Sequence, residues 1–385
     1  MNKRPSDPVL LVDHLLHEAI GLGASDIHLE PEEKRLRIRY RVDGVLLEQD
    51  AVPQESAQQL CSRIKVLAQL DLSEKRLPQD GKFSFTHDEK QVDLRVSTFP
   101  GLHGQKVVLR ILDRAQNMLC LQELGMSAEI AQQFQKLLQK ANGFFLVTGP
   151  TGSGKTTTLY SALSYLHSPE KNIITLEDPV EYNIEGVTQG QVNPAIGFTF
   201  AQGLRSLLRQ DPDVVMVGEI RDKETAQIAI ESSLTGHIVL STVHTNDAPS
   251  VIMRLMDMGI PSFLLNASLS GVMAQRLVRK LCSNCKFERS STEQEKQMLK
   301  TQSDIKLFDA TGCEMCLQTG YKGRTGIFEL LVPTAGLRAQ IVAHPDFEHL
   351  KEQAKKDGMI SLFDHGLQKV KDGTISLEEL LRVTA

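Results

Sequence analysis

The order of apolar and polar residues divides the N-terminal part of the chain into helices and hairpins. Apolar side chains recur at helical spacing over 8–22 and 54–70, which predicts two helices. The stretch LRIRYRVDGVLLEQ alternates between apolar and polar residues around Asp43-Gly44, which indicates a hairpin. KFSFTHDEKQVDLRVSTFP predicts a second hairpin and KVVLRIL a further strand, so an α/β unit precedes a connecting segment near 113–121.

After this segment the pattern changes to helices that alternate with short apolar runs. A helix is expected over 128–141, and GFFLVTGPTGSGKTTTLYSALSYL then predicts a buried strand, a Gly-rich loop and a helix. Strand-like runs recur at NIITLE, DVVMVGEI and HIVLSTV, which is typical of a parallel sheet flanked by helices. Beyond Gln275 this pattern gives way to a cysteine-bearing segment at about 276–326, and a small helical region closes the chain.

Composition is ordinary for a globular protein of two or three domains. The chain has 385 residues, of which 41% are hydrophobic and 24% charged. Its net charge of −5 argues against a surface that binds nucleic acid generally. No run approaches the roughly 18 apolar residues of a membrane-spanning helix, and the first residues lack a signal-peptide cleavage pattern. We therefore expect cytosolic residence, with membrane contact only through a partner.

The segment Gly149–Thr156 satisfies the phosphate-loop pattern G-x-x-x-x-G-K-[ST]. Its glycines let consecutive backbone N–H groups converge on a phosphate at the positive end of the following helix. Lys155 would reach the β- and γ-phosphates of ATP, and the Thr156 hydroxyl would bind Mg²⁺. The alternative is a plain Gly-rich turn, but the strand before it and the helix after it favour nucleotide binding. The nucleotide-binding residues expected are Gly149, Pro150, Thr151, Gly152, Ser153, Gly154, Lys155, Thr156 and Thr157.

Hydrolysis also requires carboxylates, and two candidates follow predicted strands. Glu177 ends IITLE, and Glu219 follows VVMVG, so both lie at the strand ends where α/β sheets bind ligands. One acidic residue at a strand end is usually a helix cap or a surface charge, but two downstream of a phosphate loop favour catalysis. Gly218 precedes Glu219 where an Asp is usual, so we expect Glu219 to contact Mg²⁺ through water. Which of the two carboxylates is the base stays open.

Two histidines flank HIVLSTV, and both are catalytic candidates. His237 and His244 are seven residues apart, so in one regular strand they would face opposite sides. Both can serve one site only from opposite ends of the strand or from flanking turns. His244 follows the strand's C-terminal end and is the better candidate for a γ-phosphate sensor. A structural histidine is the alternative for each.

Four of the six cysteines form two C-x-x-C pairs separated by 27 residues. Each pair directs two thiolates at one point, and two pairs supply a closed tetrahedral Zn²⁺ site. Such a site is structural and holds a segment too small to build a core. A redox pair is the alternative, but the matched pairs count against it. The expected zinc ligands are Cys282, Cys285, Cys313 and Cys316, whereas Cys61 and Cys120 are expected to be buried packing residues.

Four ordered segments of the chain resemble the type II/IV secretion ATPase family. GPTGSGKTTTLY, ITLEDPVEY, LLRQDPDVVMVGEIRD and TGHIVLSTVHTNDA resemble its Walker A, Asp box, Walker B and His box. ASDIHLEP, RIRYRVDG and LPQDGKF resemble its N-terminal sensor-like (PAS-like) domain. The resemblance runs from about residue 8 to the end and implies an α/β chain. The implied parts are a sensor-like domain at 1–115, a RecA-like ATPase core at 122–275, a four-cysteine zinc insert at 276–326 and a helical C-terminal region at 327–385.

The resemblance also implies a function and partners. ATP would bind between the two domains of a subunit in a homohexameric ring, and hydrolysis would drive assembly of a pseudopilus or type IV pilus. Arg95 and Arg110 match the family's N-domain arginines that reach the phosphates, although an arginine on a strand is normally a solvated residue. The four-cysteine insert favours assembly over retraction. The implied location is the cytoplasm, at the inner membrane, through platform or docking proteins of the machine.

Two other functions stay open at this point. A related ring ATPase for DNA uptake or conjugative transfer would carry a similar engine. A non-catalytic nucleotide-binding scaffold is disfavoured, because it has no need to keep Lys155, Thr156, Glu177 and Glu219 together. Many family members carry a further N-terminal domain that docks onto the membrane machinery. This chain starts almost at the sensor-like domain, which leaves its recruitment to the membrane open.

Overall fold

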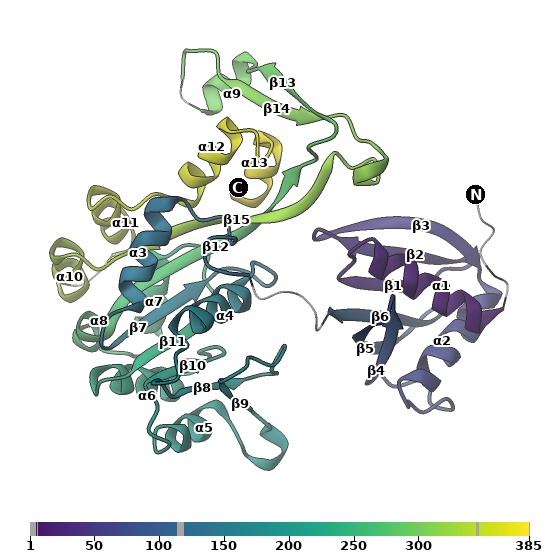
Figure 1. Ribbon diagram of the computed structural model, residues 1–385, viewed down its shortest axis with the longest axis horizontal. Coiled ribbons are helices and arrows are strands. Elements are labelled where there is room, and N and C mark those ends of the chain that lie inside the picture. Colours follow the sequence, from purple (N-terminus) through teal and green to yellow (C-terminus); the bar gives the residue numbers. More distant parts are fainter. Residues whose placement is uncertain (1–4, 6, 114–118, 300, 344–345, 385) are drawn as a thin grey trace. The chain divides into compact units, whose positions relative to one another are not determined.

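The computed structural model describes residues 5, 7–113, 119–299, 301–343 and 346–384 (Figure 1). The chain divides into two compact units, Met1–Asn117 and Met118–Ala385. Each unit has a sheet and a hydrophobic core of its own. Across the described ranges, no helix is both long and apolar enough to cross a bilayer.

Unit 1 is a six-stranded antiparallel sheet with two helices on one face (Figure 1). The strand order is β3-β2-β1-β6-β5-β4. Its elements are α1 (Pro8–Gly21), β1 (Asp26–Pro31), β2 (Arg35–Val42), β3 (Val45–Pro53), α2 (Glu55–Leu67), β4 (Gln79–His87), β5 (Lys90–Gly101) and β6 (Gly104–Asp113). Both predicted helices, both hairpins and the KVVLRIL strand (β6) are therefore confirmed, whereas β1 was not anticipated.

The first hairpin shows how the sequence sets the turn. Val42 pairs with Val45, so Asp43 and Gly44 form a two-residue connection. Both have positive φ, 50° and 84°, as a type I′ turn requires. Alternate residues of β2 are then buried under the helices, while its arginines lie on the other face.

Unit 2 is built on a seven-stranded sheet in the order β15-β12-β7-β11-β10-β8-β9. All neighbours are parallel except the edge pair β12–β15. The strands are β7 (Gly143–Thr148), β8 (Ile173–Glu177), β9 (Thr188–Gln191), β10 (Val214–Val217), β11 (Ile238–Val243), β12 (Leu269–Leu281) and β15 (Tyr321–Leu331). The predicted parallel sheet is confirmed, whereas β9, β12 and β15 were not anticipated as its members.

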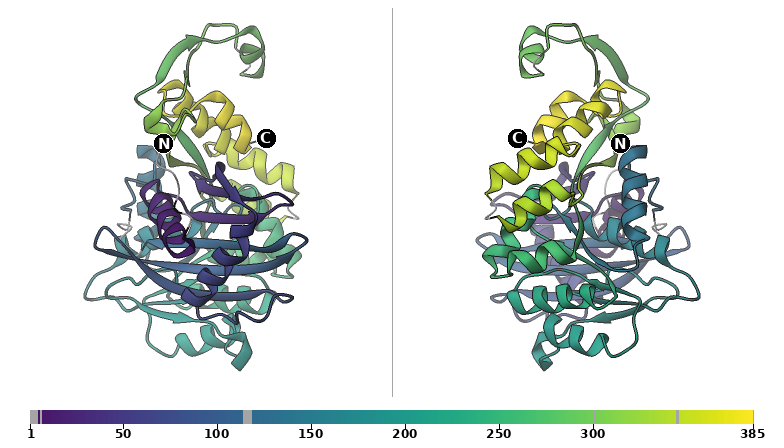
Figure 2. Two further views of the ribbon diagram at one scale, coloured as in Figure 1. Left: turned by 90° about the vertical axis from the view of Figure 1, so that its right-hand side faces the viewer. Right: turned by 90° about the vertical axis from the view of Figure 1, so that its left-hand side faces the viewer.

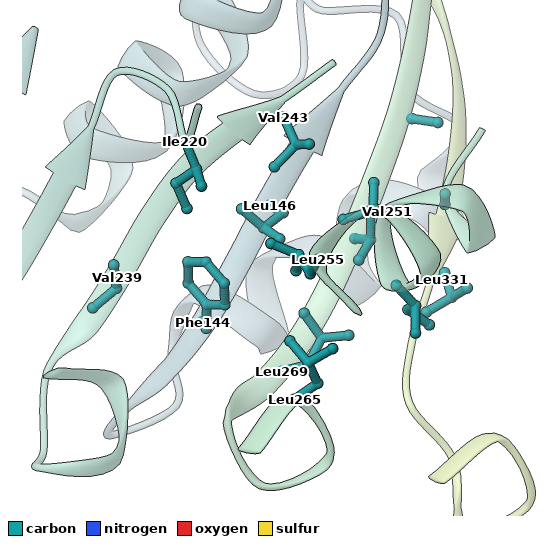
Figure 3. Close-up of a cluster of buried hydrophobic side chains, with 14 of the residues drawn as sticks. Phe144, Leu146, Ile220, Val239, Val243, Val251, Leu255, Leu265, Leu269 and Leu331 are labelled. Carbon is teal, nitrogen blue, oxygen red and sulfur yellow. The ribbon is translucent and has the colours of Figure 1, made fainter. Parts of the chain in front are cut away.

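Helices cover both faces of this sheet. The early helices are α3 (Ala128–Leu138), α4 (Lys155–Leu166), α5 (Phe200–Leu207), α6 (Lys223–Leu234), α7 (Pro249–Asp257) and α8 (Ser262–Ser268), with a 3₁₀ turn η1 (Pro194–Ile196). Phe145 and Val147 of β7 face α3 and α4, whereas Phe144 and Leu146 face the opposite layer, where they meet α7 residues such as Leu255 (Figure 3). Burial on both faces explains why β7 is apolar throughout.

The cysteine segment leaves the sheet as a continuation of β12 and β15. Beyond β12 come β13 (Lys286–Ser290), α9 (Glu293–Met298), β14 (Lys306–Ala310) and η2 (Glu314–Cys316). The β13–β14 hairpin and α9 extend beyond the C-terminal helices (Figure 2). Positions 276 and 326, the expected limits of the cysteine segment, both lie inside strands, because β12 and β15 stay paired past the parallel part of the sheet. The division of the chain into four parts stays a prediction.

The chain closes with helices that pack against the sheet. They are α10 (Ala335–Val342), α11 (Phe347–Lys356), α12 (Leu362–Lys371) and α13 (Leu377–Thr384). His365 of α12 is only 1% exposed, and its Nδ1 accepts a 2.9 Å hydrogen bond from the backbone N–H of Phe328. Burial, with the nearby charge of Lys369, lowers the pKa of His365 from 6.5 to about 4. The imidazole is therefore neutral in the folded state at neutral pH.

This buried histidine predicts a loss of stability in acid. The unfolded chain binds a proton at His365 below about pH 6.5, whereas the folded chain resists it until about pH 4. Lowering the pH from 7.5 to 5 should therefore reduce the free energy of unfolding by about 2 kcal/mol through this residue. Urea unfolding of His365→Gln should show a pH dependence weaker by that amount. The exposed His349 provides the control, and an equal change in His349→Gln would contradict the assignment.

Candidate functional site

The phosphate loop connects the end of β7 to the start of α4 and has a backbone that only glycine permits. Gly149, Gly152 and Gly154 have φ values of 146°, 77° and 87°. A Cβ on Gly149 would lie 2.5 Å from the backbone oxygen of Gln275 and 2.6 Å from Ser153 Oγ. The loop is therefore packed tightly on one side. At its C-terminal end the loop continues into α4, and the free N–H groups at the N-terminus of this helix favour binding of an anion.

Lys155 lies at the first position of α4 with its ammonium folded back onto the loop. Its Nζ donates to the backbone oxygens of Gly149, at 2.9 Å, and Pro150, at 3.1 Å. Burial lowers the pKa of Lys155, while Glu219 opposes that shift. Thr156, the expected Mg²⁺ ligand, is exposed in the first turn, and Thr157 is half-buried. This donor set, a confined ammonium beside a hydroxyl at a helix N-terminus, fits a phosphate group with its Mg²⁺.

Glu219 and His244 lie together beyond the C-terminal ends of β10 and β11. His244 Nε2 is 3.7 Å from Glu219 Oε2, and Arg221 donates to Glu219 Oε1 at 2.6 Å. This hydrogen bond, with the charges of Arg221, His244 and Lys155, lowers the pKa of Glu219. Burial and the charge of Lys155 lower the pKa of His244, which favours the neutral imidazole. The structure thus brings a carboxylate, an imidazole and an ammonium to one edge of the sheet.

Thr148, the last residue of β7, ties the His244 loop to the phosphate loop. Its buried hydroxyl donates to the backbone oxygen of Val243 at 2.8 Å and accepts the N–H of Thr245 at 2.8 Å. The residues on either side of His244 are therefore held by the residue that immediately precedes Gly149. The sequence analysis missed Thr148, although a polar residue at the end of an apolar strand is a recognisable signal.

Glu177 lies in a separate hydrogen-bond network. It is 3% exposed and accepts hydrogen bonds from Tyr160 Oη, from Thr175 Oγ1 at 2.6 Å and from Gln189 Nε2 at 3.1 Å. Its strand β8 is separated from β7 by β11 and β10, roughly 14 Å at about 4.8 Å per strand. Glu177 is therefore far from the phosphate loop along the sheet, but β8 pairs directly with β10, the strand that precedes Glu219, and a Cβ on Gly218 would lie 3.4 Å from Glu177 Cα. The Glu177 side chain turns beneath α4 into this network.

His237 lies at the opposite edge of the sheet from the phosphate loop. It precedes β11, its backbone oxygen accepts the N–H of Gly143, and its Nδ1 is 2.9 Å from the backbone oxygen of Ser232. Because β7 and β11 are parallel, Gly143 and Gly149 mark opposite ends of the same strand pair. The two histidines flank one strand, as their spacing allowed, and only His244 reaches the edge that carries the phosphate loop.

Arg95 and Arg110 belong to unit 1 and pair directly across β5 and β6. Directly paired residues of an antiparallel sheet share a face, and here it is the face opposite the helices. Arg110 Nε contacts Asp26 Oδ1 at 3.0 Å, while the side chain stays 63% exposed. Lys82 pairs with Arg95 on the other side, so a row of basic residues crosses this face of the sheet.

The four C-x-x-C sulfurs form one cluster in the described part of the chain. All lie within 4.8 Å of one another. The Sγ atoms are 3.8 Å apart for Cys282 and Cys313, 3.9 Å for Cys285 and Cys316, and 3.7 Å for Cys313 and Cys316. A tetrahedron with Zn–S bonds of about 2.3 Å has edges of roughly 3.8 Å. The backbone N–H of Gly320 also donates to Cys316 Sγ at 3.3 Å, a contact that stabilises a thiolate. The cluster fits a zinc ion.

The chain is similar over nearly its whole length to known secretion proteins. The family model described as "Type II/IV secretion system protein" matches residues 4–382. The chain is 50% identical to the "Type II secretion system ATPase E" of Vibrio cholerae, covering 98% of this chain and 75% of that protein. It is 51% identical to the "Type II secretion system protein E" of Pseudomonas aeruginosa, covering 100% of this chain and 77% of that protein.

Solved structures show the same fold. The pilus retraction motor PilT with bound ADP superposes with a TM-score of 0.63 at 27% identity, covering 96% of each chain. The Legionella pneumophila ATPase DotB superposes with a TM-score of 0.73 at 22% identity, covering 100% of this chain and 98% of that one. The mixed α/β fold predicted from the sequence is thus confirmed, whereas the PAS-like character of unit 1 stays a prediction.

The sulfur geometry predicts about one zinc per chain, because four thiolates fill a tetrahedral zinc site. Elemental analysis of purified protein checks the content. Cys313→Ser should remove the metal and lower the melting temperature of the chain. Cys120 is the matched control, since it lies exposed and not in a packed core as the sequence analysis wrongly expected. Folded, active wild-type protein without metal would refute the site.

Proposed function

The chain belongs to the type II/IV secretion system protein family, and we propose that it is a ring-forming ATPase that drives assembly of a pseudopilus or type IV pilus. Its family and its relatives, which are 50% and 51% identical over nearly the full length of this chain, identify it as an ATPase. The observation that carries the proposal is the meeting of Lys155, Glu219 and His244 beside the Gly149–Thr156 loop.

Each residue of this group has a defined task in the proposed site. The backbone of Gly149–Thr157 and the Lys155 ammonium would bind the triphosphate, and Thr156 would hold the Mg²⁺, which would neutralise phosphate charge. Glu219 is ionised at neutral pH because its pKa is lowered, so it can orient water or anchor the Mg²⁺ shell through water. His244 faces the same space as a neutral imidazole and donates to the γ-phosphate.

Glu177 and His237 need a different account. We assign Glu177 to catalysis as a second carboxylate that acts after it leaves its hydrogen bonds to Tyr160, Thr175 and Gln189. Its strand β8 pairs directly with β10, so release from these hydrogen bonds would let the carboxylate turn toward the end of the strand that precedes Glu219. His237 lies at the opposite edge, so any part it plays at a phosphate would be across a subunit boundary.

Arg95 and Arg110 are proposed to supply positive charge to the phosphates from unit 1. They share one face of the sheet, and hydrolysis of a phosphoanhydride gains most from cations placed around the transferred phosphoryl group. We propose that the chain forms a homohexamer. The sensor-like role of unit 1 and the four-part division at 115, 275 and 326 belong to the same proposal.

The cysteine segment and the cellular location complete the proposal. Zinc would hold the 276–326 segment in shape, since no buried apolar cluster of its own does so within the described residues. The ring would work in the cytoplasm and reach the inner membrane through platform or docking proteins of the secretion or pilus machine.

Two substitutions separate binding of ATP from its hydrolysis. Lys155→Ala should abolish nucleotide binding, because it removes the ammonium that lies against the loop backbone, where the β- and γ-phosphates would bind. Glu219→Gln should bind ATP but turn it over about a hundredfold more slowly, since one electrostatic group of a catalytic site contributes about that much. Equilibrium binding of a fluorescent nucleotide and steady-state phosphate release measure the two effects.

The control is Glu231→Gln, which alters an exposed carboxylate of α6 in the same unit. It should leave both measurements unchanged. Normal turnover by Glu219→Gln would remove that residue from the mechanism. Wild-type protein that binds ATP without turnover would favour the scaffold alternative.

The proposal for Glu177 has its own test. Glu177→Gln should lower turnover at least about tenfold while nucleotide affinity changes little, because a base acts in the chemical step and not in binding. Tyr160→Phe removes one of the donors that hold the carboxylate and should leave affinity unchanged as well. Equal loss of melting temperature and activity in both variants would instead make the network structural.

A further inference from the structure

One buried amide touches both the phosphate loop and the helix that follows it. Gln275 lies in β12, one residue beyond the last pair that β12 forms with β7, Ala274 with Thr148. Its side chain is 1% exposed in a strand whose other buried residues are mainly apolar. A polar side chain in such a position must satisfy its donor and acceptor within the protein, or it destabilises the fold.

The donor and the acceptor of the Gln275 amide both form hydrogen bonds, one with the phosphate loop and one with α4. Nε2 donates to the backbone oxygen of Ser153 at 2.7 Å, and Oε1 accepts from Thr158 Oγ1 at 2.8 Å. Ser153 is in the phosphate loop, and Thr158 is in the first turn and a half of α4. One side chain therefore fixes the loop relative to the helix that binds the phosphates.

The first of these hydrogen bonds determines which way a backbone donor of the loop points. The peptide that joins Ser153 to Gly154 is planar and trans, so its C=O and N–H point in opposite directions. Because Gln275 holds the Ser153 carbonyl toward β12, the Gly154 N–H points away from β12. Without the Gln275 side chain, this peptide would be free to rotate. Gly154, with a φ of 87°, would allow the rotation because glycine accepts many backbone conformations.

The backbone and the side chain of Gln275 both lie close to glycines of the loop. A Cβ added to Gly149 would lie 2.5 Å from the backbone oxygen of Gln275, and one added to Gly154 would lie 3.2 Å from its Nε2. Gln275 thus contacts the first and last glycines of the loop with its backbone and its side chain. The conformation of the loop therefore depends on close packing against this residue.

We propose that Gln275 is a positioning residue of the ATPase: it orients the Ser153–Gly154 peptide and holds α4 so that the loop is ready to bind phosphate. This rests on the proposed nucleotide site and extends it to a strand outside the motif. Gln275 acts through the loop and makes no contact with the nucleotide itself. It should therefore govern affinity and KM more than the chemical step.

The test compares Gln275→Leu with Ser270→Ala. Leucine keeps the volume of Gln275 but removes both hydrogen bonds. Ser270 is on the same strand and donates a buried hydrogen bond to the same neighbour β7, at the Phe144 backbone oxygen, far from the loop. The measurements are the Kd of a fluorescent ADP analogue, KM and kcat for ATP, and the melting temperature.

We expect Gln275→Leu to raise Kd and KM by about tenfold or more, because a buried carbonyl and a buried hydroxyl both lose their partner. The fall in kcat should be smaller than the rise in KM. Ser270→Ala should lower the melting temperature but keep Kd within about twofold, because distant sites act independently. Unchanged Kd and KM in Gln275→Leu, with a lowered melting temperature, would overturn the proposal and leave Gln275 a packing residue.

Further variants cover the case in which Gln275→Leu does not fold. Gln275→Glu keeps the acceptor for Thr158 and loses the donor to Ser153, so it should weaken binding almost as much as leucine. Thr158→Val removes only the other bond and should weaken binding less. Equal effects of Thr158→Val and Ser270→Ala on Kd, with normal binding by Gln275→Glu, would overturn the proposal.

Lys155→Ala separates the inference from the function on which it rests. If wild type binds the analogue and Lys155→Ala does not, the nucleotide site stands, and a normal Kd for Gln275→Leu then overturns the positioning role alone. If wild type itself does not bind, the nucleotide site and the positioning role both fail.

Discussion

The catalytic unit depends on a parallel sheet that is buried on both faces. Apolar residues alternate along β7 to two opposite layers of helices, so no polar side chain can be placed within the strand at low cost. Polar chemistry is confined to the edge where the strands end. The phosphate loop, Glu219 and His244 all lie there because β7, β10 and β11 run parallel and finish together.

At that edge, polar side chains outside the recognised motifs form hydrogen bonds with backbone groups of the loops. Thr148 joins the His244 loop to β7, and Gln275 joins the phosphate loop to α4. Glu177 shows the same principle on β8, where Tyr160, Thr175 and Gln189 surround its carboxylate. Buried polar groups that are satisfied in this way make the loops rigid, which spares binding the entropy of ordering them.

The strand β12 links this edge to the sulfur cluster. It begins beside β7, passes the phosphate loop at Gln275 and ends at Leu281, next to Cys282 of the sulfur cluster. Its partner β15 returns from the cysteine segment to the sheet, so a two-stranded arm connects the two regions. A segment with few buried apolar residues is stable at the end of such an arm when a metal supplies the cross-link that a core would otherwise provide.

The sequence by itself determined what depends on local pattern: the phosphate loop, the paired cysteines, both hairpins of unit 1 and the parallel strands β7, β8, β10 and β11. Glycine positions and alternation act over a few residues, so they can be recognised without the fold. Only the tertiary structure decided what depends on neighbours distant in sequence. It placed Gln275 against a loop more than a hundred residues earlier, turned the Glu177 side chain into a buried network beneath α4, sent His237 to the far edge and left Cys120 exposed. Strand order creates these contacts, and strand order is set by burial across the whole sheet, which no short stretch of sequence records.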